Sequence, residues 1–168
     1  TAQALLATMA GFYAVYHGQE GIKNIAKRIH SITTWLNKAL TRLGYVQHNE
    51  LFFDTLRFSL PDHVSAQKLR TIALSKEVNL RYYDNGDVGF SIDETTDLKD
   101  VNLLLSIFSI AAEETVQEVT DIPEASSLNR ELRRRTSFLT HEVFNKYHTE
   151  TEMMRYIKRL ERKDISLA

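Results

Sequence analysis

The chain has 168 residues, of which 43% are apolar and 26% are charged, which is ordinary usage for a globular protein. The 21 Lys and Arg nearly balance the 22 Asp and Glu, so a strongly basic protein that binds nucleic acid or a membrane surface is not expected. There is no cysteine, which excludes disulfides, thiolate metal ligands and a cysteine nucleophile within these residues. The length suits one domain, or one small domain with a tail.

The first stretch of the chain is unusually poor in charge. The first charged residue is Glu20, and residues 2–16 have the pattern of a helix that is apolar on nearly every face. The stretch lacks the basic start of a signal peptide, and polar residues dilute it too much for a membrane span. A helix that is apolar all round is normally buried. We therefore expect the chain to be a piece of a longer protein in which this helix is covered.

A long amphipathic helix and then β-type sequence follow. An apolar stripe with spacings of three and four predicts a helix from about residue 22 to a C-cap at Gly44. Alternation of apolar and polar residues predicts a strand over 52–60, with a possible short strand at 45–47 before it. Asp62 is the predicted N-cap of a helix over 63–77. The stripe of the long helix consists of Ile22, Ile25, Ile29, Ile32, Leu36, Ala39 and Leu43.

The next segment has the strongest turn signal in the chain. Asn85-Gly86 predicts a hairpin with a type I′ turn, because that turn needs two residues at positive φ. Its strands are expected at 80–83 and 88–92, and Thr96 or Asp97 is expected to cap a helix over 98–113. The order through residue 113 is therefore α-α-β-α-β-β-α. This order predicts an α+β fold in which helices cover one side of an antiparallel sheet.

The last third of the chain differs in composition. Residues 121–128 have the pattern of a linker, and a last helix is expected from about 150 to 162, with Thr149 and Glu152 forming a capping box. A basic cluster lies between them. Because aromatic residues do not interleave with this cluster, we interpret it as a contact with a partner segment or with solvent rather than a nucleic-acid site. The cluster comprises Arg130, Arg133, Arg134 and Arg135.

Few residues carry a recognisable chemistry. His141-Glu142 begins like a zinc-protease helix, but Asn145 stands where the second histidine is required. His141, His148 and Glu150 are metal-ligand types, and we expect them to serve as solvent-facing or hydrogen-bonding groups. Asp93 and Glu94 are expected to be solvated loop charges. The chain has no glycine-rich phosphate loop and no nucleophile elbow.

One short stretch is denser in functional side-chain types than the rest of the chain. From the residues alone, it suits a site or an interface better than a neutral linker. Its members are His141, Phe144, Asn145, Tyr147, His148 and Glu150.

Several runs of the sequence resemble the glycine cleavage system P-protein family. The resemblance is carried by Thr-Ala-Gln-Ala-Leu-Leu-Ala at 1–7, Tyr-Ala-Val-Tyr-His-Gly at 13–18, Arg-Thr-Ser-Phe-Leu-Thr-His at 135–141, Val-Phe-Asn-Lys-Tyr-His at 143–148, Glu-Thr-Glu-Met-Met-Arg-Tyr at 150–156 and Leu-Glu-Arg-Lys-Asp-Ile-Ser-Leu at 160–167. The family is built from two related halves, each of the fold-type-I pyridoxal-phosphate (PLP) architecture. The resemblance implies an interdomain helix at 1–17, the small C-terminal domain of the first half at 18–120, and a linker and helical connector to the second half at 121–168.

The resemblance also implies an activity for the complete protein. It implies a PLP-dependent glycine dehydrogenase that decarboxylates glycine and transfers the aminomethyl group to the lipoyl arm of the H-protein. The implied assembly is a homodimer or a two-subunit heterotetramer, in the bacterial cytoplasm or the mitochondrial matrix. The resemblance also implies that this chain contacts the large domain and the second half of the same protein.

The family places its PLP lysine in the second half, beyond residue 168. Nine lysines occur here, and none lies in a matching motif, so we assign no catalytic, cofactor-binding or metal-binding residue and expect no PLP bound to this piece. For His141–Glu150 we favour a structural role over a place in the active site; Glu142 departs from the less charged residue expected there. The lysines are Lys23, Lys27, Lys38, Lys68, Lys76, Lys99, Lys146, Lys158 and Lys163.

The order of elements leaves a second interpretation open. The β-α-β-β-α run is shared with ferredoxin-like domains that sense ligands, so the chain could be a free-standing α+β regulatory or binding module. The two interpretations differ on the first helix. A free module would pack residues 1–17 against its own core, whereas a piece of a larger enzyme would expose them and self-associate.

Overall fold

The computed structural model describes residues 3–124, 133–163 and 165. The chain divides into two compact units, one formed by Thr1–Ile25 with Ser127–Ala168 and the other by Ala26–Ser126. The expected bounds of 1–17, 18–120 and 121–168 stay a prediction about the family's domains. Among the described residues, no helix has both the length and the apolar character needed to cross a membrane.

The first helix contributes to both units. Helix α1 (Ala4–Arg42) joins the two helices expected from the sequence into one element that is interrupted at Gly18. Gly18 has φ 61° and ψ −171°, which is not helical. The gap expected between a helix over 2–16 and a second one from about residue 22 is therefore a break at Gly18 inside one helix, because helical backbone resumes immediately after it.

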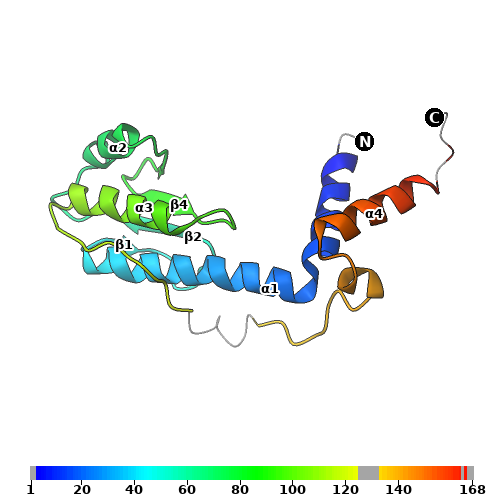
Figure 1. Cartoon of the computed structure of the whole chain (residues 1–168). Helices are drawn as coiled ribbons and strands as arrows, with labels where there is room; N and C mark the ends of the chain where they lie inside the picture. Colours follow the sequence, from blue (N-terminus) through cyan, green and yellow to red (C-terminus); the bar gives the residue numbers. More distant parts are fainter. Residues whose placement is uncertain (1–2, 125–132, 164, 166–168) are drawn as a thin grey trace. The chain divides into compact units, whose positions relative to one another are not determined.

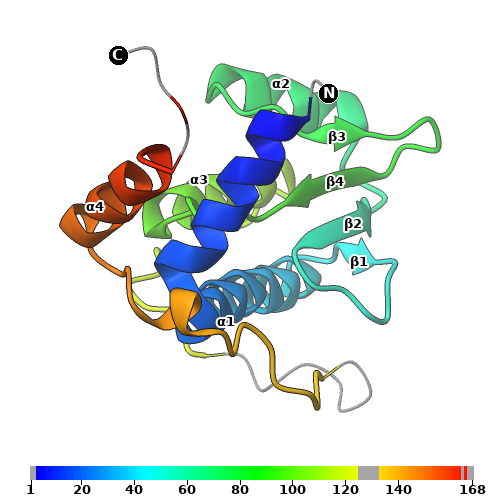
Figure 2. The ribbon, with the colours of Figure 1, turned by 90° about the vertical axis from the view of Figure 1, so that its right-hand side faces the viewer.

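The second unit contains a four-stranded antiparallel sheet in the order β1-β2-β4-β3, as Figure 2 shows. Leu56 and Phe58 of β2 are buried, and the residues between and beside them face outward, so the predicted alternation is confirmed. The strands are β1 (Val46–Gln47), β2 (Thr55–Ser59), β3 (Arg81–Tyr82) and β4 (Val88–Ser91).

Two strand predictions need correction. Strand β2 begins at Thr55 rather than at residue 52, because Phe53 leaves the ladder and stacks on His30, with ring centroids 5.6 Å apart. The hairpin is present, but its turn is not type I′. Gly86 has φ 87° and Asn85 does not have a positive φ. The bonds from Gly86 N–H to the Tyr83 carbonyl and from Tyr83 N–H to the Asp87 carbonyl instead describe a turn followed by a glycine bulge.

Two shorter helices complete the core of this unit. Helix α2 (Ala66–Ser75) is shorter than predicted because Ser65, not Asp62, is its N-cap. Helix α3 (Leu98–Ala111) begins at the predicted Asp97, which forms a capping box with Asp100. The three helices and the inner face of the sheet share one core, so the α+β class with an antiparallel sheet is confirmed (Figure 1). Fully buried members are Leu36, Leu40, Leu56, Phe58, Leu69, Val88, Val101 and Phe108.

The first unit combines the start of α1 with the C-terminal part of the chain. The 3₁₀ helix η2 (Glu142–Asn145) and helix α4 (Glu150–Glu161) lie beside α1 (Figure 1). Helix α4 agrees with its predicted range, and the Thr149 hydroxyl accepts a hydrogen bond from Glu152 N–H at its N-terminus. This is half of the predicted capping box, since the Glu152 carboxylate accepts from the Thr149 hydroxyl instead of the Thr149 backbone N–H. Of the predicted linker 121–128, residues 125–128 lie outside the described residues, as does Arg130.

Candidate functional site

His141 and Asn145 form a local turn at the start of η2. The Nδ1 atom of His141 accepts a hydrogen bond from Val143 N–H at 3.2 Å. The Asn145 side-chain amide donates to the His141 carbonyl oxygen, also at 3.2 Å. The ring of His141 therefore caps a short helix.

His148 contacts the backbone of α1. Its Nδ1 lies 2.6 Å from the carbonyl oxygen of Tyr16, and since a carbonyl can only accept, the ring carries its proton on Nδ1. A side chain at Gly18 would not fit here, because its Cβ would lie 2.8 Å from His148 Cε1 and 2.6 Å from the Phe144 carbonyl oxygen. The histidine thus sits directly on the break in α1.

Glu150 reaches the same turn of α1. The Tyr16 hydroxyl donates to Glu150 Oε1 at 3.3 Å. The negative charge of Glu150 raises the pKa of Tyr16, with burial and the hydrogen bond acting in the same direction. A phenol is protonated at neutral pH, so it acts as the hydrogen-bond donor to Glu150.

An aromatic stack lies beside this contact. The rings of Tyr147 and Tyr156 are 4.3 Å apart and nearly parallel. The Arg159 guanidinium donates to the Tyr147 hydroxyl at 2.5 Å and lies over both rings. Phe12 of α1 meets Tyr156 edge-on, with centroids 6.3 Å apart. These side chains pack α4 against α1.

The metal-ligand types in this segment do not converge on a metal site. No group of three or more His, Asp or Glu residues that could hold a metal ion occurs within residues 3–124, 133–163 and 165. His148 and Glu150 both contact Tyr16, whereas His141 caps η2. Each of the three has a hydrogen-bonding contact of its own.

The other sequence candidates are surface groups. Asp93 and Glu94 are exposed, and the hydroxyl and N–H of Thr95, together with Thr96, hydrogen-bond Asp93 and lower its pKa. Arg134 lies over the Phe138 ring at 5.1 Å, and Lys23 lies over the same ring at 5.9 Å. The described part of the basic cluster, residues 133–135, is exposed.

Sequence reasoning missed a buried carboxylate in the second unit. Asp87 is only 3% exposed, and Arg57 binds its Oδ2 through Nε at 2.8 Å and Nη2 at 2.7 Å. Ser59 donates to Oδ1 at 3.0 Å and Asn85 to Oδ2 at 2.8 Å, while His48 Nε2 lies 3.1 Å from Oδ2. Burial alone would raise the pKa of Asp87, but hydrogen bonds from Asn85, Arg57, Ser59 and His48 outweigh it and bring the pKa to about 2.

This cluster holds the sheet together rather than forming a catalytic triad. His48 Nε2 faces both Ser59 Oγ, at 2.8 Å, and Asp87, so one ring nitrogen meets both partners. In a serine nucleophile system, the two nitrogens of the histidine serve different partners. The sequence holds no local signal for this cluster, because the strand register, which pairs Arg57 with Gly89, is what brings its members together.

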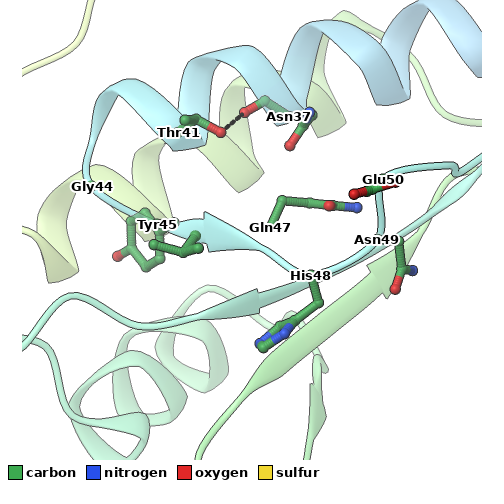
Figure 3. Close-up of a pocket in the computed structure, with 9 residues that line it drawn as sticks. Asn37, Thr41, Gly44, Tyr45, Gln47, His48, Asn49 and Glu50 are labelled. Atoms are coloured by element: carbon green, nitrogen blue, oxygen red, sulfur yellow. Dashed lines mark hydrogen bonds between the residues drawn. The ribbon is translucent and has the colours of Figure 1, made fainter.

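A hollow of about 470 Å³ lies between the end of α1 and strand β1 (Figure 3). The side-chain amides of Asn37 and Gln47 point into the space between the helix and the strand, as Figure 3 shows. Among the described residues, Asn37 Oδ1 and Gln47 Nε2 are buried without a hydrogen-bond partner. The lining consists of Asn37, Thr41, Gly44, Tyr45, Val46, Gln47, His48, Asn49 and Glu50.

Neither this hollow nor a second one fits PLP. The second, of about 210 Å³, is lined mainly by apolar residues from Val78–Leu80, Phe90–Ile92 and α3. A PLP site requires a lysine amine for the Schiff base. No lysine lines either hollow.

Comparison with known proteins gives a consistent result. The family model described as "Glycine cleavage system P-protein" matches residues 1–108. Over all 168 residues, the chain is 74% identical to glycine dehydrogenase (decarboxylating) of Bacteroides thetaiotaomicron. It is 47% identical over 167 residues to the protein of that name from Flavobacterium johnsoniae, and 49% identical over 172 residues to the one from a Nostoc species. The chain spans 17–18% of the length of these relatives.

Proposed function

The chain belongs to the glycine cleavage system P-protein family, and from this premise we propose that it is a segment of a PLP-dependent glycine dehydrogenase (decarboxylating). The single observation that carries the proposal is an alignment that covers all 168 residues of the chain with 74% identity. The complete protein would decarboxylate glycine and pass the aminomethyl group to the lipoyl arm of the H-protein. We place it in the bacterial cytoplasm, as a homodimer or a two-subunit heterotetramer.

Within that enzyme, the chain would supply structure. PLP provides the electron sink for decarboxylation when it is bound by its lysine. The family resemblance implies that the lysine comes from the second half of the enzyme, and none of the nine lysines in this chain lies in a matching motif. The four-stranded unit would be the small domain of a fold-type-I half, and residues 121–168 would lead into the second half.

The contacts of the C-terminal segment support this structural role. His148, Glu150 and Tyr156 contact α1. Side chains committed to internal packing and capping are poorly placed to bind glycine. The exposed apolar side chains of α1, at Leu5 and Met9, favour a segment of a larger enzyme over a free-standing module.

A chimeric enzyme tests the proposal. This chain replaces the matching segment in the Bacteroides thetaiotaomicron relative, and release of labelled CO₂ from carboxyl-labelled glycine is measured with PLP and lipoylated H-protein. We expect activity within about tenfold of the parent, because differences at a quarter of positions within one family are mostly tolerated. A variant that lacks the segment is the control, and it should be inactive. A chimera that folds and binds PLP but releases no CO₂ would contradict the proposal.

A further inference from the structure

Gly18 has a backbone conformation that almost no other residue adopts. Its φ of 61° with ψ of −171° belongs to a region that is essentially restricted to glycine. The residue is buried and stands inside α1 with helical backbone on both sides. Gly11, in the same helix, does not have a positive φ. A sharp break in a helix needs a local cause, and Gly18 alone permits the break without producing it.

The C-terminal segment lies at the break. The Phe144 carbonyl oxygen and the His148 ring occupy the space that a side chain at Gly18 would need. At an interruption in a helix, carbonyl groups lose their usual N–H partners. The His148 Nδ1–H donates to the Tyr16 carbonyl oxygen, just before the break, at 2.6 Å. The segment thus fills the break and bonds to its backbone.

The same segment is fastened to α1 on both sides of Gly18. Before the break, the Tyr16 hydroxyl donates to Glu150 at 3.3 Å. After the break, the Lys23 ammonium lies over the Phe138 ring at 5.9 Å. Two stretches more than 100 positions apart in sequence are therefore joined across one residue of a helix.

We propose that residues 138–150 form a strap that holds α1 broken at Gly18, and that release of the strap lets α1 close into one uninterrupted helix. The closed form would recover the helical hydrogen bonds that the break interrupts. The contacts of the strap offset that gain in the observed form. The strap would couple the direction of residues 4–17 to the docking of the C-terminal segment. This inference goes beyond the proposed activity and does not depend on it.

Substitution of Gly18 by alanine separates the two forms. Alanine strains the broken backbone and its Cβ collides with the strap, but it favours a continuous helix. In Gly18→Ala, we expect amide hydrogen exchange in the strap to accelerate by about tenfold or more, while helix content from circular dichroism is maintained or rises. Unchanged protection in the strap overturns the proposal. Loss of helix content overturns it too, because it would show unfolding rather than closure.

Gly11→Ala is the matched control. A Cβ at Gly11 meets no atom within 4 Å, so this variant adds the same methyl group to the same helix without touching the strap. Its strap protection should equal that of the unmodified chain. If Gly11→Ala accelerates strap exchange as much as Gly18→Ala does, the effect does not arise at the break and the proposal fails.

A second variant tests the strap from the other side. His148→Ala leaves the α1 sequence intact and removes the donor to Tyr16, so exchange in 138–150 should accelerate by about tenfold without loss of helix. His148→Asn keeps an N–H donor and should restore part of the protection. Equal exchange in the unmodified chain and His148→Ala would show that the strap is not held by this bond.

Discussion

At the scale of single residues, Asp87 connects parts of the sheet that are far apart in sequence. Its carboxylate meets Arg57 and Ser59 of β2, His48 beyond the end of β1, and Asn85 of the hairpin turn. A buried charge is tolerated when each oxygen is hydrogen-bonded in this way. Removing the charge while the guanidinium of Arg57 stays would leave a cation with fewer partners.

We predict that Asp87 makes the second unit sensitive to acid. The pKa of Asp87 is about 2 in the folded chain, against an ordinary value of 3.8. Because the pKa is lower in the folded chain than in the unfolded chain, ionised Asp87 stabilises the fold at pH values above about 4. This stabilisation is lost as the pH falls from about 4 towards 2. The full effect is on the order of 2 kcal/mol. Trp35, which packs against this core and is the chain's one tryptophan, reports urea unfolding at each pH.

Asp87→Asn should lower the free energy of unfolding at pH 7 and flatten its dependence between pH 4 and pH 2. Asp84→Asn is the control, because Asp84 is exposed in the same turn and should change stability by less than about 0.5 kcal/mol. Identical pH profiles for the unmodified chain and Asp87→Asn would contradict the role given to Asp87.

Contacts between residues that are close in sequence can be predicted from the sequence, whereas contacts between distant residues cannot. The N-cap of α4 is local, so the spacing of Thr149 and Glu152 predicts the bond from Glu152 N–H to the Thr149 hydroxyl, although the returning half of the capping box is replaced by a bond between the two side chains. The partners of Asp87 lie as far away as residue 48, so they meet only once the strand register is fixed. His148 against Tyr16 is more remote still. The sequence marked its segment as unusual but did not reveal its partner.

At the scale of elements, the N-cap of α2 gives a direct test. The Ser65 hydroxyl accepts from Lys68 N–H at 3.1 Å, whereas Asp62, the predicted cap, lies before the helix and is exposed. Ser65→Ala should therefore destabilise the second unit by about 1 kcal/mol, measured by urea unfolding through Trp35 fluorescence. Asp62→Ala is the matched variant and should be close to neutral. A larger loss in Asp62→Ala than in Ser65→Ala would reverse the assignment.

The helices and strands can be predicted where apolar residues recur with a regular period. The predictions are wrong where long-range packing determines the end of a strand or the type of a turn. The apolar stripe after Ile22 and the β2 alternation are both present in the structure. Strand β2 begins at Thr55, later than predicted, because Phe53 stacks on His30 of α1. The alternation of apolar and polar residues does not indicate this contact. The predicted type I′ turn is wrong at Asn85, because Asn85 does not have a positive φ. Its side chain donates to Asp87 instead.

At the scale of the whole molecule, the first helix leaves apolar surface uncovered. Leu5 is 69% exposed, Leu6 60% and Met9 57%, whereas Val15 on the same helix is buried. The sequence predicted burial for this stretch, and within this chain only part of it is buried. An apolar stripe of this kind on a helix is a surface for association.

We predict that the isolated chain self-associates through this stripe. Substituting Leu5, Leu6 and Met9 together by Gln removes apolar surface without adding charge. Sedimentation velocity should then show a shift from oligomer towards monomer, with circular dichroism unchanged. The control is a variant in which three other exposed apolar residues, Leu74, Ile110 and Met154, are substituted together by Gln. This variant should have the same association state as the unmodified chain. A monomeric unmodified chain would contradict the prediction.

The central claim is that this chain supplies structure, not the cofactor site, to a PLP enzyme. An absorbance titration of the 168-residue chain with PLP tests it most directly. The account predicts no stable band of lysine-bound PLP, because none of the nine lysines lies in a matching motif and the family resemblance places the PLP lysine in the second half of the enzyme. A stable band that a single lysine substitution abolishes would contradict it.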